Sequence, residues 1–113
     1  MPELRTTPGL RSDYHAVRIE GFLGIERYPE IRAAFGSLPA LPTLVDLRDG
    51  TGADSVFLSE LLLLRRRHAE PIAVVIPPSG NLARIFSLVG MSEKMNVFTD
   101  LDSALRALGV AGH

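Results

Sequence analysis

Two short polar residues, Asp54 and Ser55, stand directly before a leucine-rich run that reaches His68. The segment 43–47 that precedes them is apolar and is followed by a glycine-containing stretch at 50–53, so the expected order is strand, loop and helix. Aspartate and serine are preferred at helix N-caps, because a short side-chain oxygen can accept hydrogen bonds from the free amides of the first turn. The simplest prediction for this pair is therefore a helix cap at the end of a strand-to-helix loop.

Side chains that could catalyse a reaction or bind a metal form no convincing pattern. Ser55, His68 and Asp46 could be named as a catalytic triad, but the serine lacks the sequence context of a nucleophile elbow. The histidines have no spacing typical of a metal site, and there is no cysteine. We therefore predict no enzyme activity, no metal and no cofactor. The turn at 78–81 could offer backbone amides to an anion or a nucleotide, which leaves a small-ligand site as an alternative.

Length and composition predict one globular domain. The chain has 113 residues, of which 46% are hydrophobic, and a formal net charge of -1. We expect one domain over residues 1–113 with its core at about 14–109, because this length suits a single hydrophobic core. No apolar run approaches the roughly 20 residues that span a bilayer, and the first residues do not form a signal peptide, so we expect a cytoplasmic protein without membrane insertion. The balanced charge gives no reason to expect direct binding of nucleic acid.

Several segments have the pattern of a β-strand. Residues 14–20 alternate between two faces, as in a half-buried strand. Residues 44–47 and 72–76 are almost continuously apolar, which is typical of parallel strands covered on both faces by helices. We therefore predict that these two strands are parallel neighbours, with the intervening helix crossing between them. The remaining strand candidates are short and lie at 3–7, an edge strand, and at 95–98.

Helical spacing of apolar residues occurs in four segments. They are 29–38, 56–68, 82–90 and 101–108. Thr99 and Asp102 form a capping-box-like start for the last helix, and Gly90 and Gly109 are expected to follow the last two helices. The alternation of strands and helices predicts an α/β fold with a mainly parallel central sheet and about four helices. The edge strand at 3–7 would add an antiparallel N-terminal edge through a hairpin.

Taken in order, these segments resemble a STAS domain, the fold of bacterial anti-sigma factor antagonists. Residues 19–23 are similar to the family's strand-glycine-leucine entry, 44–47 to its central strand with an acidic residue, and 53–55 to its phosphorylation loop. Further similarities are the leucine-rich helix ending in arginines at 61–67, and the closing helix, glycine and last strand at 87–91 and 97–98. The resemblance extends over about residues 14–108 and implies a single STAS-like domain.

The resemblance implies a regulatory domain that binds an anti-sigma factor, a serine kinase that phosphorylates Ser55. The family usually follows that serine with a second serine or threonine and a glycine, whereas Val56 and Phe57 stand here. We expect Phe57 to place an aromatic ring beside the phosphate acceptor. This departure favours an alternative, a STAS-like scaffold that binds a protein or a small ligand such as a nucleotide without phosphorylation. Formation of a homodimer is left open.

A phosphate on Ser55 makes physical sense at this position. It would add about 1.5 to 2 negative charges beside a helix N-terminus, where free amides and the helix dipole favour an anion. The domain should therefore tolerate the modification. Its effect would fall on the partner, because Asp54 already makes the neighbourhood acidic.

The helix at 56–68 separates an apolar arc from a polar face. Val56 and Leu63 fall on the polar face, two turns apart and next to Ser55, although isolated exposed apolar residues are common on their own. The side chains expected to pack on the sheet are Phe57, Leu58, Leu61, Leu62, Leu64 and His68. We hypothesise that a partner binds the opposite surface, formed by Asp54, Ser55, Val56, Ser59, Glu60, Leu63 and Arg67.

Overall fold

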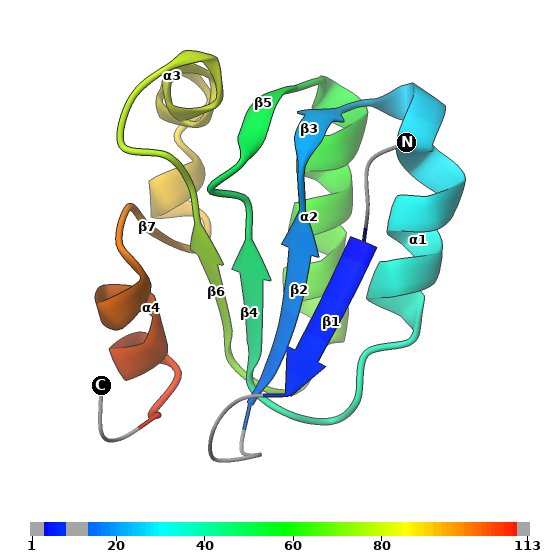
Figure 1. The fold of residues 1–113 in the computed structure, drawn as a ribbon, viewed down its shortest axis with the longest axis vertical. Coiled ribbons are helices and arrows are strands. Elements are labelled where there is room, and N and C mark those ends of the chain that lie inside the picture. Colours follow the sequence, from blue (N-terminus) through cyan, green and yellow to red (C-terminus); the bar gives the residue numbers. More distant parts are fainter. Residues whose placement is uncertain (1–3, 9–13, 111–113) are drawn as a thin grey trace.

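The computed structural model describes residues 4–8 and 14–110, including the side chains of 14–110. Five strands form the central sheet in the order β1-β2-β4-β6-β7, and every neighbouring pair is parallel except β1 with β2 (Figure 1). Their bounds are β1 Leu4–Pro8, β2 His15–Ile19, β4 Thr43–Asp46, β6 Ile72–Val75 and β7 Asn96–Phe98. The predicted mainly parallel sheet with an antiparallel N-terminal edge is confirmed. Glu3, the first residue expected in the edge strand, lies outside the described residues.

Four α-helices lie in the described part of the chain and cover both faces of the sheet. They are α1 Tyr28–Gly36, α2 Ser55–Arg67, α3 Asn81–Leu88 and α4 Leu101–Ala107. Helices α1, α2 and α3 contribute side chains to the larger core cluster, and α4 contributes to a smaller cluster on the other face of the sheet (Figure 1). As predicted, α2 lies in the connection between β4 and β6, which are parallel neighbours. None of these helices is long and apolar enough to cross a bilayer.

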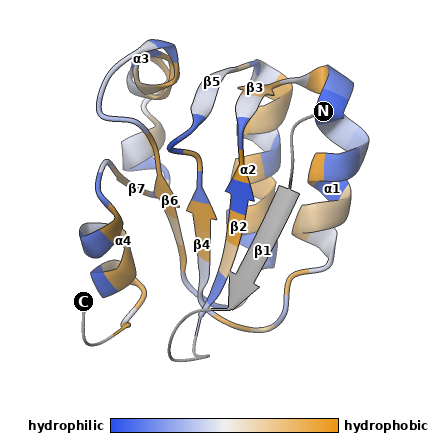
Figure 2. Ribbon diagram, viewed as in Figure 1, coloured by the Kyte–Doolittle hydropathy of each residue, from blue (hydrophilic) through white to orange (hydrophobic). Residues whose placement is uncertain are grey.

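The central strands are apolar on both sides because both of their faces are covered. All four residues of β4 and all four of β6 are buried, and the ribbon is orange over much of both strands in Figure 2. Val45 and Val74 belong to the larger cluster, whereas Leu44 and Ala73 belong to the smaller one, so alternate side chains serve opposite faces. The continuous apolar pattern therefore reports strands between two helical layers, as expected.

A second sheet of two parallel strands, β3 Gly21–Leu23 and β5 Gly50–Ala53, follows β2 and β4 in the chain (Figure 1). The sequence predicts a loop at 50–53, and this prediction is wrong. The segment Gly-Thr-Gly-Ala carries no strand pattern, and its pairing depends on the turn after β4. There, the Gly50 amide donates to the Leu47 carbonyl at 2.9 Å and the Gly21 amide to the Asp49 carbonyl at 3.0 Å. Gly21 has a φ of 81°, which allows β2 to bend into β3.

The predicted glycines after α3 and α4 are confirmed, whereas the predicted N-cap of α4 is wrong. Gly90 and Gly109 follow α3 and α4 with φ values of 66° and 81°, as expected for glycines that end helices. The predicted cap at Thr99 is wrong, because Asp100 is the N-cap of α4. Its carboxylate accepts hydrogen bonds from the Ser103 amide at 2.8 Å and the Ser103 hydroxyl at 2.9 Å. The cap therefore lies one residue after the predicted position.

Candidate functional site

Asp54 joins the β3–β5 sheet to the start of α2. One carboxylate oxygen accepts a hydrogen bond from the Phe57 amide at 3.1 Å, so Asp54 is the N-cap of α2. The other oxygen accepts from the Ile25 amide at 2.9 Å, and the Asp54 amide donates to the Leu23 carbonyl at 3.1 Å. A single side chain therefore satisfies a free amide of the helix and fixes the loop that follows β3.

Ser55 is the first residue of α2, and its side chain is exposed. The predicted cap of this helix is confirmed for Asp54 alone, so capping does not consume the hydroxyl of Ser55. A phosphate on this hydroxyl would lie beside the amides of the first helical turn, which carry partial positive charge. The same phosphate would also lie next to the Asp54 carboxylate. The start of α2 is therefore a position that can accommodate an added anion.

Phe57 packs in the core, as the helical spacing of 56–68 predicts, and does not lie beside the phosphate acceptor, as its place after Ser55 suggests. Its side chain is 1% exposed, and its ring lies 6.3 Å from the ring of Phe35 in the larger core cluster. The correction follows from helical geometry, because two residues of a helix turn the side chain by about 200° from Ser55 toward the sheet. The phenylalanine at position 57 is therefore accommodated in the hydrophobic core. Val56, the other departure, is half-buried.

The predicted polar face of α2 is confirmed at Ser59, Leu63 and Arg67, which are all exposed. Leu63 is 42% exposed, whereas Leu61 and Leu64 on the other side of the helix are almost fully buried. With Ser55, these residues are spaced four apart, so they form one stripe along the helix. We call Ser55, Ser59, Leu63 and Arg67 the α2 stripe. Leu62, expected to pack on the sheet, is half-buried against the larger cluster.

Glu60 is not on the exposed face, and its predicted placement there is wrong. Its side chain is 6% exposed and accepts a hydrogen bond from the Tyr28 hydroxyl of α1 at 3.0 Å. The Arg32 guanidinium lies 5.2 Å from the centre of the same tyrosine ring. Helix α1 packs beside α2 and covers this side of it, which the sequence of α2 alone does not reveal. Glu60 therefore links two helices rather than facing a partner.

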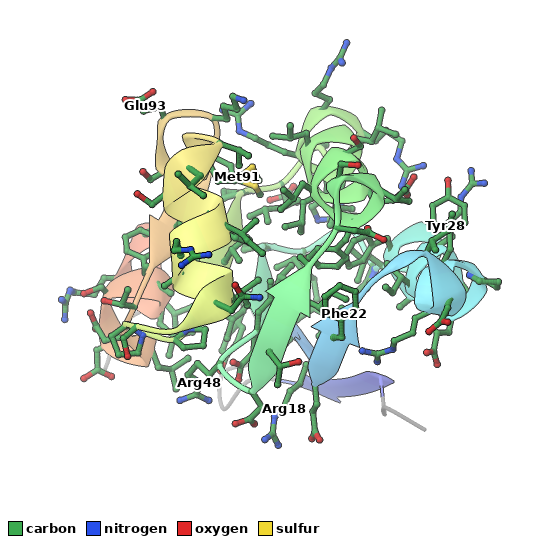
Figure 3. All side chains as sticks on the ribbon, turned by 90° about the horizontal axis from the view of Figure 1, so that it is seen from above. Arg18, Phe22, Tyr28, Arg48, Met91 and Glu93 are labelled. Carbon is green, nitrogen blue, oxygen red and sulfur yellow. The ribbon has the colours of Figure 1, made fainter. Side chains whose placement is uncertain are left out.

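The acidic residue of the central strand, Asp46, forms an ion pair. Its carboxylate accepts from the Arg48 guanidinium at 2.9 and 2.8 Å and from the Arg48 amide at 3.1 Å. Burial raises the pKa of Asp46, but the hydrogen bonds and charge of Arg48, with the charge of Arg18, lower this pKa below its ordinary value. Arg18 also pairs with Asp49. In the view from above in Figure 3, Arg18 and Arg48 both lie along the lower edge of the molecule.

The residues that could be named as a triad are far apart. His68 contacts the Leu41 carbonyl at 2.8 Å and the Thr43 hydroxyl at 3.2 Å, at the far end of α2 from Ser55. A helix of 13 residues is about 20 Å long, so the serine and the histidine cannot react together. Asp46 is occupied by Arg48. The described residues also contain no group of three or more His, Cys, Asp or Glu that could hold a metal.

A hollow that sequence reasoning missed lies beside Asp54. It has a volume of about 460 Å³ and is lined by Phe22, Gly24, Ile25, Glu26, Arg27 and Asp54. We call it the β3 hollow. Its two apolar side chains, Phe22 and Ile25, are 53% and 63% exposed. The available signal is that Phe22 and Ile25 are apolar residues that each follow a glycine, Gly21 and Gly24.

Comparison with known proteins adds evidence on the fold. No family model and no curated protein matches this sequence. Among solved structures, an anti-sigma factor antagonist from Mycobacterium paratuberculosis matches with a TM-score of 0.81 and 20% identity, over 95% of both chains. A putative anti-sigma factor antagonist from Thermotoga maritima matches with a TM-score of 0.75 and 14% identity, over 94% of both chains.

A third similar structure is an uncharacterised protein with a SpoIIAA-like fold from Shewanella loihica. Its TM-score is 0.54 and its identity 19%, over 95% of this chain and 93% of that one. At these identities the likeness concerns the fold, and it extends over nearly the whole chain. The STAS-like architecture that the sequence resemblance implies is confirmed. The chain therefore has the SpoIIAA-like α/β fold of the solved anti-sigma factor antagonists.

Proposed function

We propose that this domain is a regulatory protein-binding module that binds an anti-sigma factor at the end of the molecule that carries Ser55. The observation that carries the proposal is the geometry at the start of α2. Asp54 performs the capping, and Ser55 is left exposed on the first helical residue. The solved proteins of this fold that are named as anti-sigma factor antagonists support the choice of partner.

The proposed partner surface is the α2 stripe together with the adjoining part of Val56. Leu63 supplies apolar area on an otherwise polar stripe; because it is 42% exposed, a partner that covers it would gain only part of the about 1.5 to 3 kcal/mol that full burial of such a side chain contributes. Ser59 and Arg67 flank it as exposed polar groups. Asp54 belongs to the surface through its neighbouring carboxylate. Glu60 is left out, because α1 covers it.

Phosphorylation of Ser55 by a serine kinase that is also the anti-sigma factor is proposed as the gate. A phosphate would place about 1.5 to 2 negative charges next to Asp54, which changes the charge that the partner must match. The helix N-terminus favours the added anion, so the loss of binding should occur without loss of the fold. Since Phe57 points into the core, its ring does not obstruct access to the hydroxyl.

The test is affinity capture from the native cell extract with mass spectrometry. The wild-type domain should capture a protein of the anti-sigma kinase type, and a fraction of the domain recovered from cells should carry phosphate on Ser55. Leu63→Asp should lose this protein while its thermal unfolding stays close to that of the wild type. Leu88→Asp is the matched control, because Leu88 is also an exposed leucine, 76% exposed on α3.

Two outcomes would contradict the proposal. One is that no anti-sigma protein is captured, and the other is that Leu63→Asp captures it as well as Leu88→Asp does. Capture without any phosphate on Ser55 would instead support the second candidate, a scaffold of the same fold that binds its partner without phosphorylation. Val56, at a position where the family usually has a hydroxyl residue, is the observation that favours this second candidate.

A further inference from the structure

The ring of Phe22 packs against two glycines, Gly24 and Gly52, while more than half of the residue's surface is exposed. A Cβ atom on Gly24 would lie 2.6 Å from Cε2 of Phe22, and one on Gly52 would lie 3.2 Å from its Cδ1 and Cε1 atoms. The ring therefore occupies space that any larger residue at these positions would fill. Figure 3, seen from the top of Figure 1, shows Phe22 at this end of the molecule beside β5. The backbone thus supports an aromatic ring outside the core.

Among the described residues, the side chains around this ring that form no ion pair are acidic. The same Cβ position on Gly24 lies 3.2 Å from Oδ2 of Asp54, so the carboxylate is next to the ring. Glu26 also lines the β3 hollow and is exposed. The Arg27 guanidinium faces internal acceptors, since it donates to the Glu30 carboxylate at 3.0 Å and to the Phe22 carbonyl at 3.1 Å, and its buried Nη2 atom has no hydrogen-bond partner among the described residues. The hollow therefore combines an exposed aromatic ring with two carboxylates.

We infer that the β3 hollow is the seat for an arginine side chain of the protein partner. A guanidinium stacks on an aromatic face and forms paired hydrogen bonds to carboxylates, so one side chain satisfies both features of the hollow. An apolar side chain would leave the carboxylates desolvated, and a phosphate would be repelled by them. This inference rests on the proposed function, because the hollow adjoins Ser55, and it adds the chemistry that the partner must present.

The experiment is an NMR titration of the ¹⁵N-labelled domain with N-acetyl-arginine amide, which needs no natural partner. We expect saturable shifts at the backbone amides of Phe22 and Ile25, the second of which donates to Asp54. Binding should weaken about two- to fivefold in Phe22→Ala, the range of an exposed cation–π contact. Glu26→Gln should also weaken it. Leu88→Ala, which removes an exposed apolar side chain on α3, should leave binding unchanged.

N-acetyl-lysine amide carries the same charge and is the matched ligand. The arginine compound should bind more tightly than it does, because a guanidinium stacks and pairs in one plane. Equal binding of the two compounds, unchanged binding in Phe22→Ala, or shifts confined to another part of the surface would each overturn the inference. Failure here with capture of an anti-sigma protein would leave the proposed function standing. Arginine binding at the hollow without such capture would overturn the proposed function alone.

Discussion

The five-stranded sheet and the β3–β5 sheet are built from consecutive parts of the same chain, yet they have opposite character. In the first, β4 and β6 are buried along their whole length between two helical layers. In the second, the strands contain Gly21, Gly50 and Gly52, and Phe22 is exposed. The difference indicates a division of roles. The large sheet supplies most of the core, whereas the small sheet adds Leu23 and Ala53 to the core and, with the start of α2, supplies a surface.

The largest expected effect compares two substitutions that lie three residues apart. Ile19 in β2 is fully buried, so Ile19→Ala should lower the free energy of unfolding by about 2 to 5 kcal/mol. Phe22 in β3 is 53% exposed, so Phe22→Ala should cost roughly 1 kcal/mol or less, although phenylalanine is the larger side chain. Urea unfolding of both variants measures the difference. Equal costs would show that the small sheet supports the core as much as the large one does.

A smaller effect is expected at the junction between the small sheet and α2. Asp54→Ala removes the cap of α2 and the acceptor of the Ile25 amide, so we expect a loss of about 0.5 to 2 kcal/mol of stability. Asp54→Asn should lose less, because asparagine is also a good N-cap residue. The same urea experiment measures both. If Asp54→Ala is neutral, the carboxylate does not hold the junction together.

The smallest effect concerns pH at the carboxyl end of β4. The pKa of folded Asp46 is lowered by Arg48, so this pair stabilises the protein above the ordinary pKa of aspartate. That contribution is lost as the pH falls through the lower, folded pKa. Arg48→Ala leaves the burial of Asp46 and the backbone amide at 48 but removes the guanidinium and its charge, so the pKa of Asp46 should rise. A ¹³C NMR titration of this carboxyl group measures it, with Arg66→Ala as a control. A pKa that stays the same or falls in Arg48→Ala would refute this explanation.

The same contrast explains what the sequence could predict. The strands β4 and β6 were predictable because a continuous apolar run needs cover on both faces, and the face of α2 that carries Leu61 and Leu64 followed from helical spacing. Strand β5 was not predictable, because Gly-Thr-Gly-Ala has no pattern and forms a strand only beside β3. The residue patterns within single segments predicted the large sheet. The small sheet depends on contacts between segments that are distant in the sequence.

The candidate site was predictable to a similar extent. Asp54 as a cap and Leu63 as an exposed residue followed from local rules. The burial of Glu60 depends on where α1 packs, and the β3 hollow depends on Phe22 lying against Gly24, just after β3, and Gly52 of β5. Those arrangements are tertiary, so no spacing within one helix or strand reports them.

The central claim is that the surface around Ser55 can change its binding without changing the stability of the domain. The most direct measurement is the affinity of the captured anti-sigma protein for the wild type, Ser55→Ala and Ser55→Glu by isothermal titration calorimetry, with the thermal midpoint of each variant. We predict that Ser55→Glu loses at least about tenfold in affinity, or 1.4 kcal/mol, while Ser55→Ala binds like the wild type. The thermal midpoints should remain close, because a helix N-terminus accommodates the negative charge. Equal affinity for all three proteins, or a loss in Ser55→Glu accompanied by unfolding, would contradict the account.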